Sequence, residues 1–220
     1  MDPAVICSAL SAEDSSVRLR ASLIAGSYPN PQYIDVLVAR CSVEQAFFVR
    51  DMLTWALIHQ ERALALPAVL AELTSPIAQA RAQALHTISK FAEPESWSAI
   101  SDLLLFDADP AVARTAWRAA VILVPPVERE ALAERLCTQL GRGDRDLQLS
   151  LSRELVNLGD AAVAALGKAR SSKRLEVRTH AIATERLAAN PESGFDAALE
   201  QATRQAVLQG APLIDPTLLD

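Results

Sequence analysis

Hydrophobic residues recur at steps of three and four along nearly the whole chain, and no segment shows the strict alternation of a β-strand. Two such series are Ile34, Leu37, Val38, Cys41 and Leu66, Val69, Leu70, Leu73. This spacing places the apolar side chains on one face of a helix. The chain is therefore predicted to be all-α.

A longer repeat lies over this helical period. A small or branched apolar residue, often followed by Arg, opens an Ala- and Leu-rich helix at Val17, Val49, Ala80, Val112, Leu147 and Val177. A second helix follows each one, with its first buried residue expected at Ile34, Leu66, Trp97, Leu132, Val163 and Phe195. Because each pair can bury its apolar stripe only against neighbouring pairs, we expect an α-α superhelix of about six antiparallel helix pairs.

The predicted domain covers residues 1–220 without a break. Pro and Gly fall between the helices, and Asp14 and Asp109 precede opening helices, where a carboxylate caps unpaired N–H groups. Residues 1–12 are expected to hold a short capping helix built on Ala4, Val5, Ile6 and Leu10, and residues 13–205 the six repeats. The tail, residues 206–220, contains two prolines and either covers the last repeat or docks on another chain.

Three segments carry a family resemblance: VNLGDAAVAALGKA (156–169), LALPAVLAEL (64–73) and DADPAVARTA (107–116). They resemble HEAT repeats of the phycobilisome-lyase type, and the resemblance extends over residues 13–205. It departs from the repeat pattern at Ala113 and Gln148, where Arg is usual. The resemblance implies a right-handed solenoid whose second helices line a concave face.

Composition narrows the function classes. Half of the 220 residues are apolar, and the net charge of −6 opposes unspecific attraction to nucleic acid or an anionic membrane. No apolar run is long enough for a membrane span, and the first residues do not form a basic leader, so a soluble cytoplasmic protein is expected. The cysteines Cys7, Cys41 and Cys137 are odd in number and far apart, which predicts reduced, buried thiols.

Catalytic and metal-binding signatures are absent from the sequence. The three histidines fall in different repeats without a ligand partner at helical spacing, and no nucleophile motif or phosphate loop occurs. No catalytic residue, metal or cofactor is predicted. The recurring Arg18, Arg50, Arg81 and Arg178 are expected to bind the Asp or carbonyl groups of the preceding turn, and the alternative is an anion-binding ladder.

Three tryptophans, Trp55, Trp97 and Trp117, require comparison with the HEAT-like glycosylases that excise alkylated bases. That class, built on the same scaffold, uses aromatic and acidic residues in a basic groove, but no Trp and Asp lie one helical turn apart on a concave helix of this chain. A place in the core is the favoured interpretation for each tryptophan, because each falls on an apolar stripe and the chain is acidic.

The predicted binding surface follows from positions on the second helices. Residues one and five places after the first buried residue should face the groove, namely Asp35, Ser98, Asp102, Asp196 and Glu200, with Lys168 as a basic exception. The alternative site is a basic edge formed by Lys168, Arg170, Lys173 and Arg174.

The leading hypothesis is a non-enzymatic scaffold or adaptor that binds a basic or mixed-charge protein or peptide along its concave face. One alternative is a nucleic-acid-binding or base-excising relative of the HEAT-like glycosylases. The other, implied by the phycobilisome-lyase resemblance, is a lyase or chaperone-like accessory for a cofactor-bearing protein.

Overall fold

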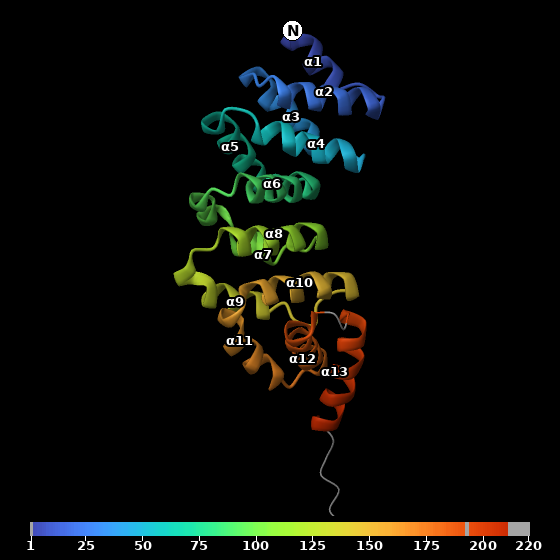
Figure 1. Cartoon of the computed structure of the whole chain (residues 1–220), viewed down its shortest axis with the longest axis vertical. Coiled ribbons are helices and arrows are strands. Elements are labelled where there is room, and N and C mark those ends of the chain that lie inside the picture. The colour runs from blue at the N-terminus through green and yellow to red at the C-terminus, as the bar shows by residue number, and fades with distance from the viewer. Residues whose placement is uncertain (1, 192–193, 211–220) are drawn as a thin grey trace, which may run out of the picture. The chain divides into compact units, whose positions relative to one another are not determined.

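A computed structural model describes residues 2–191 and 194–210 of the chain, with side chains described through residue 206. Every regular element in this part of the chain is helical, which confirms the all-α prediction (Figure 1). The helices form two compact units, Met1–Pro125 and Pro126–Asp220.

The first unit contains two layers of helices. The opening helices α2 (Ser15–Ser27), α4 (Phe47–Ile58), α6 (Ala78–Phe91) and α8 (Pro110–Leu123) pack side by side in chain order (Figure 1). The second elements of the first two repeats are α3 (Ile34–Cys41) and α5 (Arg62–Ala71), which also pack on each other. Short 3₁₀ turns, η1 (Pro31–Tyr33) and η2 (Glu72–Thr74), join these layers.

The second unit repeats this alternation. Its elements are η4 (Pro126–Glu128), α9 (Arg129–Cys137), α10 (Arg145–Leu158), α11 (Asp160–Arg170), α12 (Leu175–Ala189) and α13 (Phe195–Gly210). Opening helix α10 packs on α12, and second helix α9 packs on α11. The described chain therefore has a HEAT-like fold of stacked helix pairs.

Local sequence signals place the helix starts. Asp14 accepts a hydrogen bond from the Ser16 N–H, and Asp109 caps α8 in the same way, as predicted. The opening residues of the inner repeats are buried: Val49, Ala80, Val112 and Leu147. The opening residues of the first and last repeats differ: Val17 is exposed and Val177 is half-buried.

The arginine after the opening residue binds the loop in front of its own helix. Nη1 of Arg50 donates to the carbonyl oxygens of Glu44 and Gln45, at 3.0 and 2.8 Å. These two carbonyls lie six and five residues before the arginine. Arg18 and Arg178 also bind both of the equivalent carbonyls, and Arg81 binds the one six residues before it. The structural interpretation of these arginines is confirmed, since each guanidinium ties its helix to the preceding turn.

Two of these arginines also reach an acid in the next loop. Nε and Nη2 of Arg18 bind the Glu44 carboxylate at 2.6 and 2.8 Å, and Nε of Arg81 binds Asp107 at 2.9 Å. Each acid lies five residues before the next opening residue and accepts a backbone N–H two residues further on. Burial acts to raise the pKa of the Glu44 carboxyl, but the bonds from Arg18, from that N–H and from Arg40 outweigh it and lower the pKa to about 2. These charged links join the first repeat to the second and the third to the fourth.

The predicted register is wrong in two second helices, and one second element is broken. Val163 is 65% exposed, because α11 buries Ala162, Ala165 and Leu166 instead. Leu66 is only half-buried for the same reason, since closely packed helices favour the small alanines on the contact side. In the third repeat a 3₁₀ helix, η3 (Pro94–Ala99), is followed by the short α7 (Asp102–Leu105), and this break leaves Trp97 half-buried.

The two ends of the described chain differ in how well they were predicted. The N-terminal helix α1 (Pro3–Leu10) is present and buries Ile6 and Leu10 against α2 and α3, whereas Ala4 and Val5 are exposed. At the other end, α13 continues to Gly210, so the first residues of the predicted tail are helical. Residues 211–220, and with them the two interpretations of the tail, lie outside the described residues.

Helix α13 is not an equivalent of the other second helices. Its Phe195, Ala198, Ala202 and Ala206 form a cluster with Ile182 and Ala183 of α12, and the half-buried Leu187 packs against this cluster. Ala183 and Leu187 lie six and ten residues after the opening residue Val177, and earlier repeats leave these positions exposed or half-buried. Helix α13 therefore covers a face of the opening helix that the other repeats leave open.

Candidate protein-binding surface

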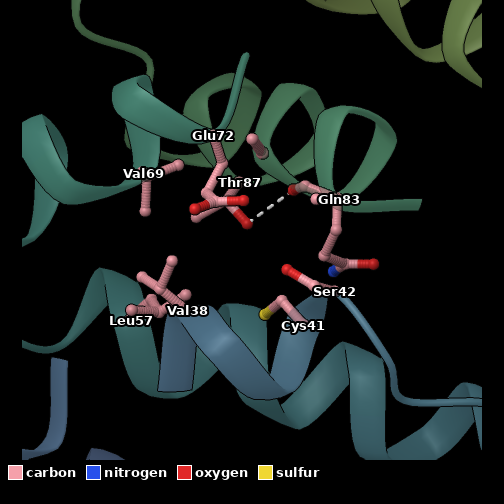
Figure 2. Close-up of a pocket in the computed structure, with 10 residues that line it drawn as sticks. Val38, Cys41, Ser42, Leu57, Val69, Glu72, Gln83 and Thr87 are labelled. Carbon is pink, nitrogen blue, oxygen red and sulfur yellow. Dashed lines mark hydrogen bonds between the residues drawn. The ribbon is translucent and has the colours of Figure 1, made fainter. Parts of the chain in front are cut away.

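A narrow gap lies in the first unit, between α3, α4, α5 and α6. Val38, Cys41 and Ser42 approach it from α3, and Glu72 and Gln83 from the opposite side (Figure 2). Its free space is about 10 Å³, which is the room needed for one water molecule. The gap is therefore a packing defect beside the Thr87–Gln83 hydrogen bond, and not a ligand site.

Cys41 and Cys137 are not activated as nucleophiles. All three are free, and burial raises the pKa of Cys41 and of Cys137 to about 12, so both thiols stay protonated at neutral pH. Within the described residues no group of His, Cys, Asp and Glu could hold a metal ion. No described helix is both long and apolar enough to cross a membrane.

A larger hollow lies on the opening helices of the first unit. It has a volume of about 340 Å³, and we call it the α4–α6–α8 groove. It is lined by Phe47, Arg50, Asp51, Ala82, Gln83, His86, Arg114, Thr115 and Arg118. These side chains converge because they occupy equivalent positions in successive repeats: Asp51, Ala82 and Arg114 each lie two residues after the opening residue, and His86 and Arg118 six residues after it. Stacking of the repeats therefore aligns them across three helices.

By residue count the lining of the groove is basic, in contrast to the chain as a whole. Three arginines and one aspartate line it, and Arg114 and Arg118 are both exposed, one helical turn apart on α8. Burial lowers the pKa of the His86 imidazole, Lys90 and Arg118 lower it further, and Asp51 partly opposes them. His86 is therefore uncharged at neutral pH, and the positive charge comes from the arginines.

Exposed aromatic side chains lie at one end of the groove. Phe47 and Phe48 begin α4 and are 66% and 74% exposed, with their rings edge to face at a centroid distance of 5.6 Å. Phe47 lines the groove, while Arg50 behind it is anchored to the loop. Aromatic and arginine side chains are the residues most enriched in the centres of protein interfaces.

The acidic residues predicted from the second helices are all exposed, but they belong to different units. Asp35 lies in the first turn of α3, Ser98 on η3, and Asp102 at the start of α7. Asp196 and Glu200 lie on α13, where Asp196 pairs with Arg145 at 3.1 Å and Glu200 pairs with Arg204. Each unit therefore carries only part of the predicted set, and the part on α13 lies on a helix that is not equivalent to α3.

Three of the four residues in the predicted basic edge pair with acids. Lys168 binds Glu134 of α9 at 2.7 Å. Arg170 binds Glu185 at 3.3 Å, and Arg174 binds Glu176 at 2.7 Å. Lys173 is exposed, and its carbonyl accepts from Arg178. The edge is thus less positive than the sequence indicates.

The tryptophans have three different environments. Trp117 is completely buried, and its Nε1 donates to the Leu105 carbonyl at 2.8 Å, which confirms the core interpretation for this residue. Trp55 is half-buried, with its ring 4.3 Å from that of His59. Trp97 is half-buried on η3.

The groove was not predicted from the sequence, because the prediction used positions on the second helices, which the family resemblance assigns to the concave face. A signal was nevertheless present in the sequence. Aligning the opening helices on Val49, Ala80 and Val112 places Arg114 and Arg118 at positions that are exposed or half-buried in all three helices.

Comparisons with known proteins return similar folds only. No protein-family model matches the chain, and no curated protein matches it. Among solved structures, an engineered protein is 18% identical, with 88% of this chain and 100% of the other covered at a TM-score of 0.47. The CpcE–CpcF complex of phycocyanin lyase from Nostoc sp. PCC7120 is 16% identical, with 100% of this chain and 91% of that chain covered and a TM-score of 0.48. Human deoxyhypusine hydroxylase in complex with glycerol is 15% identical, with 93% of this chain and 94% of that chain covered and a TM-score of 0.46.

Proposed function

We propose that this chain is a non-enzymatic scaffold or adaptor, which binds a partner protein through the first unit. The observation that carries the proposal is the α4–α6–α8 groove, where exposed Phe47 and the arginines Arg114 and Arg118 surround a hollow of about 340 Å³. Such a combination of aromatic and guanidinium groups around a recess favours protein contacts.

The roles of the buried titratable groups favour binding over catalysis. Glu44 neutralises Arg18 and Arg40, and His180 is bonded to Gly141, Gln148 and Ser152 in the second unit. These groups hold helices together, and none of them lines the groove. A binding role therefore uses the surface and leaves the buried polar groups structural.

The proposed site differs from the one predicted from the sequence. The sequence favours an acidic concave face and a basic or mixed-charge partner, whereas the groove is positive and suits a partner of opposite charge. The accessory role for a cofactor-bearing protein, which comes from the phycobilisome-lyase resemblance, remains a prediction. Its test is a chromophore retained when the chain is purified from its source cells.

Site-specific photo-crosslinking tests the proposal. A benzophenone amino acid at Phe48, beside the groove, should give a discrete protein adduct in the source cells. The matched control is the same amino acid at Val127, which is 91% exposed in the second unit and should give none. Adducts at neither position, or equally at both, would contradict a partner-binding surface at the groove.

A further inference from the structure

The second unit contains an example of a helix seated on opening helices. Helix α13 lies over α12 and reaches α10, where the half-buried Leu149 packs against the same apolar cluster. Leu199 and Thr203 of α13 face Gln148 and Thr179 across a shallow hollow. Gln148 lies one residue, and Leu149 and Thr179 two residues, after their opening residues.

The α4–α6–α8 groove is formed by the same repeat positions. Arg50 corresponds to Gln148, Arg114 corresponds to Leu149 and Thr179, and Arg118 corresponds to Ala183. Opening helices of this chain can therefore support a helix at these positions, and α13 does so in the second unit. In the first unit, no helix of the described residues lies there.

The fit of α13 shows which features a seated helix needs. Its contact side is narrow, with Phe195 at the start and the small side chains Ala198, Ala202 and Ala206 following at helical spacing. Polar bonds flank this stripe: Asp196 pairs with Arg145 of α10, and Arg186 of α12 donates to Gln201 and Gln205. The small residues let α13 pack close to the opening helices, and the polar bonds fix its position along them.

The side chains around the α4–α6–α8 groove require different polar groups on a seated helix from those that α13 carries. Positions that hold Leu149, Thr179 and Ala183 in the second unit hold arginine in α8. Guanidinium groups bind carboxylates with two parallel hydrogen bonds, which lysine or amide groups cannot match. The small Ala82 and the exposed Phe47 leave space and apolar surface between these charges.

We infer that the α4–α6–α8 groove binds an amphipathic helix of the partner, with a narrow stripe of small apolar residues flanked by Asp or Glu. The inference rests on the proposed function and names the chemistry of the partner segment. Its carboxylates bind Arg114 and Arg118, and its apolar stripe lies over Ala82 and toward Phe47.

Two synthetic peptides provide the test. Each has the 16-residue length of α13 and keeps Phe and Ala at the positions of Phe195, Ala198, Ala202 and Ala206. The acidic peptide carries Glu at the flanking positions, and the basic peptide carries Lys there. Fluorescence anisotropy with the full chain should show binding of the acidic peptide, weakened by added salt, and no binding of the basic one.

Charge reversal locates the site. The Arg114→Glu/Arg118→Glu variant should bind the acidic peptide at least about tenfold more weakly and should gain binding of the basic peptide. The Lys173→Glu/Arg174→Glu variant is the matched control, because it makes the same charge change on the other candidate surface and should bind like the wild type. An unchanged thermal midpoint shows that both variants are folded.

Three results overturn the inference: equal binding of both peptides, retention of the acidic peptide by the Arg114→Glu/Arg118→Glu variant, or its loss in the control variant. Tight, salt-sensitive binding of a short DNA duplex in place of the acidic peptide also overturns it in favour of nucleic acid. If the crosslinked partner at Phe48 persists while the acidic peptide fails to bind, the inference fails and the proposed function stands.

Discussion

At the scale of single residues, the opening arginine acts as a clamp whose partners are backbone carbonyls. The sequence shows the regularity of the arginines but not the acceptors, because a carbonyl is present at every position and only the folded loop selects one. Gln148 illustrates the point. It stands where the repeat usually has Arg, and its Nε2 donates to the Gly143 carbonyl at 3.2 Å. Gln148 therefore departs from the repeat pattern but still binds the carbonyl five residues before it.

Replacing Glu44 tests the charged link between the first two repeats. The Glu44→Gln variant should lower the free energy of unfolding by about 3 kcal/mol, because it leaves the buried Arg18 guanidinium without its counter-charge. Urea denaturation measures the change. Glu61→Gln, an exposed change of the same kind at the start of α5, should stay within about 0.5 kcal/mol of the wild type.

The same carboxyl sets an acid limit on stability. Because its folded pKa is lowered to about 2, the stability from ionised Glu44 is complete above the ordinary value of 4.5 and is lost as the pH falls toward 2. Glu44→Gln should therefore flatten the pH dependence of unfolding in that range. An equally steep dependence in the variant would contradict the assignment.

Gly26 is fixed by contact and not by its backbone angles. A Cβ atom at this position would lie 2.2 Å from Cζ3 of Trp55 on the neighbouring opening helix. Gly26→Ala should destabilise the chain by about 1 to 3 kcal/mol, measured by thermal unfolding, because the indole ring must move. The same change in a Trp55→Leu background should cost clearly less, and equal costs in both backgrounds would show that the ring is not the obstacle.

At the scale of helices, two interfaces share a buried polar triad. Gln83 Nε2 donates to the Arg50 carbonyl and to Thr54 Oγ1, and Thr54 contacts Thr87. In the second unit His180 Nε2 lies 3.0 Å from both the Gln148 carbonyl and Ser152 Oγ, and Ser152 contacts Thr184. The two triads occupy identical repeat positions, so Gln83 and His180 make equivalent hydrogen bonds with different side chains.

The histidine version makes its interface sensitive to acid. Burial lowers the pKa of His180 to about 4, although its bond to the Gln148 carbonyl opposes the shift. The folded state therefore favours the neutral imidazole. The resulting stability is complete above the ordinary pKa of 6.5 and falls with pH by at most about 1.4 kcal/mol per unit down to about 4.

His180→Gln, which copies Gln83, should fold and should remove this slope between pH 6.5 and 4. Chemical denaturation at several pH values, compared with the wild type, measures it. Persistence of the full slope in His180→Gln would assign it to another group.

Sequence patterns predict the helices better than their contact sides. The opening helices begin where the apolar period and the caps at Asp14 and Asp109 place them. The errors fall in α5 and α11, where several alanines compete with Leu66 and Val163 for the buried side. Hydropathy ranks the larger side chain first, but close helix packing selects the smaller one, and only the neighbouring helix decides between them.

At the scale of the whole molecule, the charge distribution depends on which residues the fold brings together. The acidic total of the chain does not predict the positive α4–α6–α8 groove, because the groove draws arginines from α4 and α8. The positive count in residues 168–178 does not predict a basic surface either, because Glu134 and Glu185 come from other helices to neutralise it. Local sums of charge therefore mislead in both directions.

The acidic residues predicted from the second helices remain a separate hypothesis with its own test. Converting Asp35, Asp102 and Glu200 to Lys should change the free energy of unfolding by no more than about 0.5 kcal/mol, because all three are exposed. If they attract a basic partner, stopped-flow association with that partner should slow and lose its salt dependence. Unchanged association would exclude these acids and leave the groove.

Charged and hydroxyl residues alternate five positions before the opening residue in the first unit, in the order Glu44, Ser75, Asp107. Only the acids can neutralise an arginine of the previous repeat, so Arg18 and Arg81 depend on a partner that every second loop supplies. Arg50 precedes the serine loop and is held by carbonyl oxygens alone. A repeat that begins with a serine loop, inserted directly after the repeat of Arg18 or Arg81, would leave that arginine without its acid, so a repeat inserted there must bring an acidic loop of its own.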